Sequence, residues 1–279
     1  MEEEQKKKEQ KKKEQGPLRR ILITVAYDGT NYHGFQKQNS GAVTIEGVLN
    51  DTLTNVFKEP IEVIGASRTD TGVHAYGNLA VFDTHSRIEA EKVPYALNRS
   101  LPEDIRVLCG EEVPLDFHPR KCDTIKTYEY RIYNAPFNLP QKRLYSYWTY
   151  AKLDVEKMRR ATGYFIGTHD FASFCSAGTQ TPTTVRTLYE LTVETDDPFD
   201  SEDDPEAPVC RDIVIRVSGR GFLYNMVRII AGTLMEVGKG RIEPEQIADI
   251  IEARDREAAG PTAPPEGLTL VGYEITGKA

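Results

Sequence analysis

The stretch of the chain best suited to chemistry is a polar loop between two apolar runs. Gly65–Ala75 reads GASRTDTGVHA, and its one carboxylate, Asp70, follows Arg68 by two residues. A carboxylate in such a loop can act as a nucleophile or a general base, and loops held by a rigid sheet often carry catalytic residues. The residues alone leave a structural alternative, in which Asp70 forms an Asx-turn toward Gly72 and Arg68 is simply exposed.

Residue spacing excludes several other familiar chemistries. Gly232–Gly240 (GTLMEVGKG) has five residues between its first glycine and Gly238 and no hydroxyl residue after Lys239, so it is not a Walker A loop. Ser67 does not lie in a G-x-S-x-G nucleophile elbow. The five histidines and four cysteines show neither metal-ligand spacing nor a C-x-x-C pair. We therefore expect no metal site.

Charged residues are distributed unevenly along the chain. The formal net charge is −8, but seven carboxylates and no Lys or Arg lie between Thr195 and Glu206. His118–Arg143 carries six basic and two acidic residues, and Ser218–Arg241 carries four basic and one acidic. Patches of this size can contact phosphates, although they are also common on solvated strand faces. The distribution permits RNA binding without demonstrating it.

Length and composition are typical of a folded protein with two modest lobes. Of 279 residues, 39% are hydrophobic and 28% are charged. The apolar run Gly221–Met235 is too short to span a bilayer and is interrupted by Asn225 and Arg228. The N-terminus, EEEQKKKEQKKKEQ, lacks the apolar core of a signal peptide. We expect no membrane segment and a cytoplasmic location.

Hydrophobic periodicity predicts an α+β fold. After a charged low-complexity tail at residues 1–17, a first lobe at 18–116 has expected strands at 21–27, 61–66, 79–84 and 105–108 and expected helices at 45–56 and 89–97. A second lobe at 117–279 has expected strands at 123–133, 184–194, 209–218 and 268–275 and expected helices at 155–165, 221–237 and 244–254. An acidic insert occupies 195–208. We expect mostly antiparallel sheet flanked by helices in both lobes.

Six motifs follow one another from the first strand to the last. They are Tyr27–Gln36 (YDGTNYHGFQ), Ser67–Ala75 (SRTDTGVHA), Leu97–Pro102 (LNRSLP), Gly167–Phe171 (GTHDF), Gly221–Arg228 (GFLYNMVR) and Ala263–Leu268 (APPEGL). In this order they resemble the signatures of the TruA family of tRNA pseudouridine synthases. Ordered matches across both lobes are far more specific than any single motif.

The resemblance implies a pseudouridine synthase fold with the active-site cleft between the two lobes. It implies an isomerase, a tRNA pseudouridine(38-40) synthase, that flips a uridine of the anticodon stem-loop out of its stack. Such an enzyme cleaves the bond between ribose C1′ and uracil N1 and rejoins C1′ to C5, at positions 38, 39 and 40 of the tRNA. The implied partners are tRNA and a second copy of the chain in a homodimer, and no metal or organic cofactor is implied.

Five residues match positions of the family's active site. Asp70 matches the essential carboxylate, which either attacks C1′ or abstracts the 2′ proton. Arg228 matches its partner arginine, and we expect it to keep Asp70 ionised. Tyr128, within a Lys-Thr-Tyr segment that resembles the K-x-Y motif, matches the tyrosine that packs on the flipped base. Leu268 matches a leucine lining the uracil pocket, and Arg68 an arginine linked to base extrusion.

Three positions depart from the family pattern. Thr71 replaces the usual alanine, Asn78 replaces a glutamine, and Thr269 replaces an aromatic residue. These differences bear on the RNA fit more than on the reaction type. Two rival interpretations remain open: a non-catalytic RNA-binding paralogue, and a paralogue that modifies other RNAs. Pseudouridine mapping on unmodified tRNA distinguishes the first, and substrate comparison the second.

Overall fold

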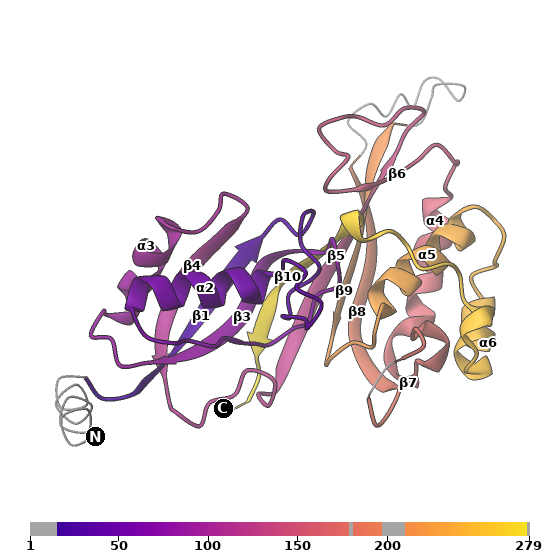
Figure 1. The fold of residues 1–279 in the computed structure, drawn as a ribbon. Coiled ribbons are helices and arrows are strands. Elements are labelled where there is room, and N and C mark those ends of the chain that lie inside the picture. Colours follow the sequence, from indigo (N-terminus) through magenta and orange to yellow (C-terminus); the bar gives the residue numbers. More distant parts are fainter. Residues whose placement is uncertain (1–15, 179–180, 197–209, 278–279) are drawn as a thin grey trace, which may run out of the picture.

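One mixed sheet runs through both halves of the protein (Figure 1). The structure is a computed structural model that describes residues 16–178, 181–196 and 210–277. Within those residues the sheet has ten strands in the order β4-β1-β3-β10-β5-β9-β8-β7, with β2 beside β3 and β6 beside β5. The strands are β1 (Arg19–Tyr27), β2 (Ile64–Gly65), β3 (His74–Thr84), β4 (Ile105–Val113), β5 (Thr124–Asn134), β6 (Tyr147–Thr149), β7 (Gly167–Asp170), β8 (Val185–Asp196), β9 (Arg211–Gly219) and β10 (Leu268–Ile275).

Most neighbouring strands are antiparallel, and only the β10–β3 and β5–β6 pairs among the described strands are parallel. The α-helices that pack on this sheet are α2 (Ile45–Phe57), α3 (Val93–Asn98), α4 (Val155–Thr162), α5 (Met226–Gly238) and α6 (Gln246–Ala253). In Figure 1, α2 and α3 lie with strands β1, β3 and β4, whereas α4 and α5 lie on the side of β8 and β9, with α6 beyond them. The expected α+β architecture with mostly antiparallel sheet is confirmed.

Local sequence accounts for the helix of the first half. The Thr44 hydroxyl accepts a hydrogen bond from the Gly47 backbone N–H at 3.2 Å and so caps the start of α2. The helix ends at Lys58, which adopts a left-handed conformation with φ of 59°. Its buried face consists of the apolar Ile45, Leu49 and Leu53, which recur every four positions, together with Thr52.

The last strand joins the two halves. β10 lies between β3 and β5, where Thr269 pairs in parallel with His74 and Leu268 pairs in antiparallel register with Tyr130. Figure 1 shows β10 in the middle of the sheet, although it is the C-terminal element. Residues from the first half, the second half and the C-terminus are therefore neighbours at the centre of the sheet.

One apolar core continues from the first half into the second on the helix-covered face of the sheet. It joins α2 and β1 to β5 and α5, and its members include Ile23, Leu49, Tyr130, Ile230 and Leu234, all fully buried. The opposite face carries a much smaller cluster made of Leu22, Val81 and Phe117. A shared core fixes the two halves relative to each other, because its close packing resists sliding.

The structure corrects three expected boundaries. The strand predicted at 61–66 is reduced to Ile64–Gly65, and the strand predicted at 79–84 begins earlier, at His74. The helix predicted from residue 221 begins only at Met226, since Asn225 has a φ of 60° that a right-handed helix cannot contain. The short strands β6 and β7 were not predicted from the sequence.

Two predicted segments lie largely outside the described residues. They are the N-terminal tail at 1–17, of which 16 and 17 are described, and the acidic insert at 195–208, of which 195 and 196 are described. Among the described helices, none combines the length and apolarity needed to cross a bilayer.

Candidate active site

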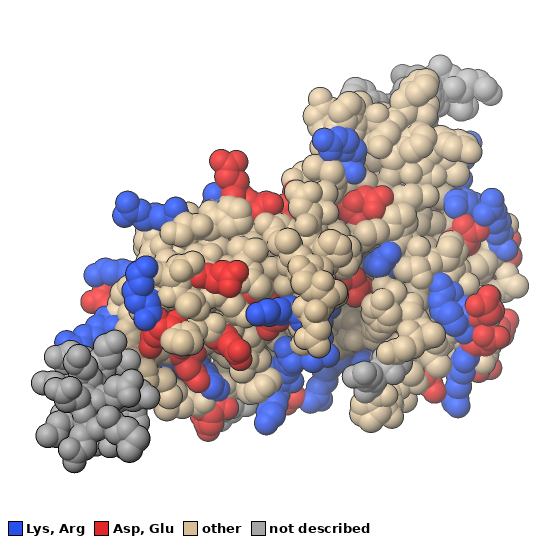
Figure 2. Space-filling model, viewed as in Figure 1, with Lys and Arg blue, Asp and Glu red and all other residues tan. Residues whose placement is uncertain are grey.

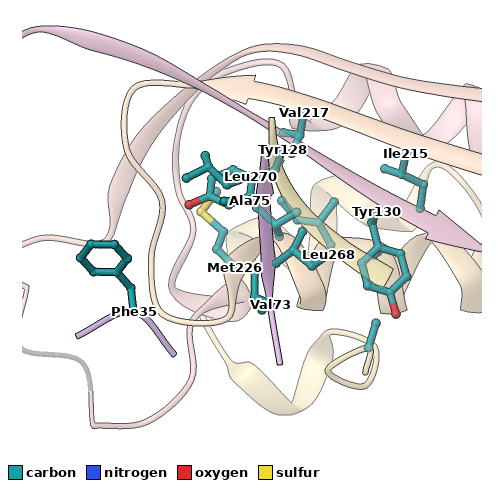
Figure 3. Close-up of a cluster of buried hydrophobic side chains, with 14 of the residues drawn as sticks. Phe35, Val73, Ala75, Tyr128, Tyr130, Ile215, Val217, Met226, Leu268 and Leu270 are labelled. Atoms are coloured by element: carbon teal, nitrogen blue, oxygen red, sulfur yellow. The ribbon is translucent and has the colours of Figure 1, made fainter. Parts of the chain in front are cut away.

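A cavity of about 670 Å³ lies where the two halves meet. The loop between β2 and β3 contributes Arg68 and Asp70 to its wall, β5 contributes Tyr128, and the start of β10 contributes Leu268. The segment from Phe222 to Val227, which leads into α5, forms another part of the wall. Tyr128 and Leu268 are labelled in Figure 3 among the apolar side chains of the core, together with Val73 and Met226, which also line the cavity.

Four of the five predicted site residues line this cavity, and the fifth lies beside it. Arg228 belongs to the first turn of α5 and lines an adjoining cavity of about 500 Å³, which also contains Arg68 and Asp70. The fold therefore brings all five predicted residues together, although they come from segments far apart in the sequence.

The loop that carries Asp70 is held in place by backbone contacts with the segment before α2. The Phe35 N–H donates to the Thr69 carbonyl at 3.1 Å, and the Gly72 N–H donates to the Tyr32 carbonyl at 3.2 Å. Gly34 makes this approach possible, because its φ is +81° and a Cβ there would lie 2.5 Å from the Thr69 carbonyl oxygen. This close packing connects the first two sequence motifs.

The Asp70 side chain does not form the Asx-turn that the residues alone left open. Its backbone carbonyl accepts a hydrogen bond from the Val73 N–H at 3.1 Å. Its carboxylate accepts none from the described residues, and 26% of the side chain is exposed at the junction of the two cavities. A carboxylate with no structural hydrogen bonds is available to a ligand.

Arg228 lies beside Asp70, with its Nη1 atom 3.8 Å from the carboxylate Oδ2. Two further contacts fix the guanidinium: its Nε donates to the Ala263 carbonyl at 2.7 Å, and Nη1 donates to the Asn225 side-chain oxygen at 2.9 Å. A cation anchored in this way keeps its position whether or not Asp70 is charged.

Burial and the neighbouring charge act on Asp70 in opposite directions. Removal of water raises the pKa of the Asp70 carboxyl above its ordinary value, and the positive charge of Arg228 lowers it, with the burial effect being the larger. The expectation that Arg228 favours the ionised form is thus correct in direction. Arg228 limits the rise in pKa without abolishing it.

Tyr128 and Leu268 provide an apolar wall. The Tyr128 side chain is only 9% exposed, and its ring packs edge-on against Phe222 with centroids 5.1 Å apart and planes at 82°. Burial raises the pKa of the Tyr128 phenol to about 12, so the hydroxyl is neutral at physiological pH. A flat neutral surface next to a carboxylate suits a nucleobase on the wall and a sugar at Asp70.

Arg68 is exposed and has no hydrogen-bond or ion-pair partner among the described residues. It lies two residues from Asp70 and lines both cavities. Because nothing in the described part of the protein holds its guanidinium, the side chain is free to contact a ligand.

A buried hydrogen-bond network supports the loop that carries Arg68 and Asp70. Asn78, which is fully buried, donates through Nδ2 to the Ser67 carbonyl at 3.0 Å and to the Tyr27 hydroxyl at 3.2 Å. Its Oδ1 accepts from the Tyr273 hydroxyl at 2.7 Å. Tyr27 in turn shares a 2.8 Å hydrogen bond with the Thr69 hydroxyl. The residues on either side of Arg68 are thus fixed.

Sequence reasoning treated Asn78 only as a departure from the family pattern and did not identify Arg120 as part of the cavity. It placed Lys126 on the same strand face as Tyr128, two positions away, but gave it no role of its own. Within residues 16–178, 181–196 and 210–277, no group of three or more His, Cys, Asp or Glu side chains is arranged to hold a metal ion.

Comparison with known proteins places these residues in one family. The sequence pattern of the family described as tRNA pseudouridine synthase matches residues 23–120 and 161–274. The chain is 45% identical over 254 residues to tRNA pseudouridine synthase A of Thermoanaerobacter sp. (strain X514), which covers 91% of this chain and 98% of that protein. It is also 45% identical over 254 residues to the protein of that name from Acetivibrio thermocellus, with the same coverage.

A third relative, tRNA pseudouridine synthase A 2 of Clostridium tetani, is 46% identical over 253 residues, covering 90% of this chain and 97% of that protein. The segments matched by the family pattern include the loop that carries Asp70, the start of α5 and most of β10, whereas β5 lies between the two matched segments.

Proposed function

Because the chain belongs to the tRNA pseudouridine synthase family, we propose that it isomerises uridine to pseudouridine in the anticodon stem-loop of tRNA, at positions 38, 39 and 40. One observation carries the chemistry. The Asp70 carboxylate, free of hydrogen bonds from the described residues, lies 3.8 Å from the Arg228 guanidinium in a cavity that also contains the Tyr128 ring.

The proposed reaction rearranges bonds without net gain or loss of atoms. The bond between C1′ and N1 of the uridine breaks, the detached uracil turns, and C5 bonds to C1′. The proton on C5 leaves, and N1 takes up a proton in its place. Either route left open for Asp70, attack on C1′ or abstraction of the 2′ proton, requires its ionised form. The position of Arg228 supports this requirement, because a nearby cation favours the charged carboxylate.

The target uridine must leave its stack to reach Asp70, and we propose that Tyr128, Leu268 and Arg68 make this possible. The Tyr128 ring supplies a neutral face on which uracil can pack, and Leu268 closes the apolar side of the pocket. Arg68 is unpaired and exposed at the cavity mouth, so its planar guanidinium can fill the space that the base leaves. Stacking of this kind is worth about 1–3 kcal/mol per base.

Incubation of the protein with unmodified tRNA containing tritium at uridine C5 tests the proposal. We expect release of tritium and pseudouridine at positions 38 to 40, with the Asp70→Asn variant inactive. Asp51 is exposed on α2, so Asp51→Asn is the matched control and should remain active. Absence of pseudouridine with the wild-type protein, or an active Asp70→Asn variant, contradicts the proposal. Pseudouridine elsewhere in the tRNA contradicts only the assignment of positions.

We also propose that the protein acts as a homodimer, with one tRNA contacting both subunits. The support is the family resemblance. Light scattering coupled to size-exclusion chromatography tests it: the dimer should have twice the chain mass of 31.4 kDa. A single species at the monomer mass at assay concentrations refutes this part of the proposal.

A further inference from the structure

Three cations share the cavity with Asp70, and none has a partner that would neutralise it. Arg68, Arg120 and Lys126 all line the cavity wall. No carboxylate of the described residues lies within ion-pair distance of any of them, whereas Arg228, the fourth cation nearby, is close to Asp70. Figure 2 shows Lys and Arg side chains gathered beside the hollow between the two halves.

Lys126 is the least solvated of the three. It lies on β5 two residues before Tyr128, so both side chains point to the same face of the sheet. Its ammonium lies 5.6 Å from the centre of the Tyr273 ring, which partly compensates the charge. Burial, followed by the positive charge of Arg120, lowers the pKa of Lys126 to about 8. A negative charge placed beside this ammonium would therefore stabilise its charged form.

Arg120 is held next to the catalytic loop. Its Nε donates to the Gly65 carbonyl at 2.8 Å, at the residue that begins the loop toward Asp70. Arg120 lines the cavity, and its two terminal nitrogens have no hydrogen-bond partner among the described residues. Burial and the charge of Arg68 lower the pKa of Arg120. Like charges therefore converge here, which costs free energy unless an anion joins them.

We propose that Lys126 and Arg120 form a seat for one phosphodiester of the RNA backbone, directly next to the uridine that enters the cavity. This inference rests on the proposed function. If the base lies on Tyr128 and the sugar at Asp70, the phosphates attached to that sugar are the nearest anions that a substrate can bring. The seat offers the two complementary forms of phosphate recognition, a planar guanidinium and a compact ammonium.

The seat would distinguish a nucleotide within a chain from a free nucleoside. The phosphate holds the backbone while the base rotates, and binding energy from a group that does not react serves to position the sugar at Asp70. Arg68, which lies outside the seat, remains free to follow the departing base.

A chemical double-mutant cycle tests the seat directly. Anticodon stem-loops carry either a normal phosphate or an uncharged methylphosphonate on the 5′ or the 3′ side of the target uridine. Binding is measured with the Asp70→Asn protein, so that the RNA is not converted, with and without Lys126→Met. We expect one of the two methylphosphonates to weaken binding about tenfold when Lys126 is present and hardly at all when it is absent.

A second readout is the salt dependence of binding. Loss of one phosphate contact should make the slope of log K against log salt concentration shallower by about 0.7–0.9. Lys92 is the matched control, since it is exposed and paired with Glu89 outside the cavity. Lys92→Met should leave the effect of the methylphosphonates unchanged. Should Lys126→Met fail to fold, Arg120→Gln takes its place, and Lys126→Arg should retain most of the coupling.

The inference is overturned if Lys126→Met and Arg120→Gln weaken binding by the same factor for charged and neutral linkages on both sides of the uridine. That result is distinct from failure of the proposed function, which would be the absence of pseudouridine in tRNA treated with the wild-type protein. An active wild-type enzyme without coupling removes only the phosphate seat.

Discussion

Replacement of Arg228 by glutamine removes the cation beside the Asp70 carboxylate while keeping a side chain that can donate hydrogen bonds. Nη1 of Arg228 and Oδ2 of Asp70 are 3.8 Å apart, a distance at which two unit charges interact by about 4 kcal/mol at an effective dielectric constant of 20. The side chains are 15% and 26% exposed, so water screens part of this energy. Arginine next to a carboxylate typically lowers its pKa by about 1–3 units.

The pKa of Asp70 should therefore rise further in Arg228→Gln, in addition to the rise that burial already causes. In the proposed reaction the ionised carboxylate is the active form, so the rate increases as the pH rises through this pKa. The acidic limb of the pH–rate profile should move to higher pH. Below the limb, activity should fall about 10- to 1000-fold, and at high pH it should recover.

The assay is single-turnover tritium release from uridine C5 between about pH 5.5 and 9, since single turnovers isolate the chemical step. Arg228→Lys keeps a positive charge and should move the limb less than Arg228→Gln. Thermal unfolding of each variant is the control, because Arg228 also holds the Ala263 carbonyl at 2.7 Å. The electrostatic role of Arg228 is refuted if Arg228→Gln is folded, loses activity by the same factor at every pH, and keeps the acidic limb of its pH–rate profile at the wild-type position.

Three further predictions concern the pocket and its support. Tyr128→Ala should weaken binding of the anticodon stem-loop by about 1–3 kcal/mol through lost stacking, whereas Tyr128→Phe should keep most of it; titration of labelled RNA measures both. Asn78→Leu should lower the free energy of unfolding in urea by about 1–3 kcal/mol, because the Ser67 carbonyl and the Tyr273 hydroxyl lose their buried partner. Asp70→Asn should unfold at a higher temperature than the wild type at neutral pH. Burial raises the folded-state pKa of Asp70, so ionisation destabilises the fold above that pKa, and the difference should vanish as the pH falls to about 4.

For each of these three predictions, one result would contradict the reasoning. Equal loss of affinity in Tyr128→Ala and Tyr128→Phe would mean that the hydroxyl, not the ring face, holds the RNA. Unchanged stability of Asn78→Leu would mean that water replaces the buried network. A stability difference between Asp70→Asn and the wild type that persists at pH 4 would exclude ionisation as its cause.

The elements with strong local signals were predictable, and their arrangement was not. The helix α2 and the strands β1 and β10 follow from hydrophobic spacing and a capping threonine, which act over a few residues. The position of β10 between β3 and β5 depends on pairings between distant parts of the chain, which periodicity does not encode. β7 has four residues and β6 has three, too few for an alternating pattern to be recognised.

The candidate site, like the fold, was predictable from the sequence only in part. Asp70, Tyr128 and Arg228 were identified by motif resemblance, and the structure brings them together. The Asp70 pKa could not be predicted in this way, because it depends on how much water the loop excludes. Arg120 and Asn78 were missed as site components, since their significance comes from neighbours that only the folded chain provides: the Gly65 carbonyl for one and the Tyr273 hydroxyl for the other.

The central place of β10 has a consequence for biosynthesis. A ribosome makes this strand after β3 and β5, so for a time the nascent chain has both of them available but lacks the element that joins them. Until the strand emerges, two open sheet edges are exposed to other chains, and Leu268 is missing from the pocket. Premature termination even a few residues before Leu268 would leave a protein with most of its mass and an incomplete pocket around Asp70.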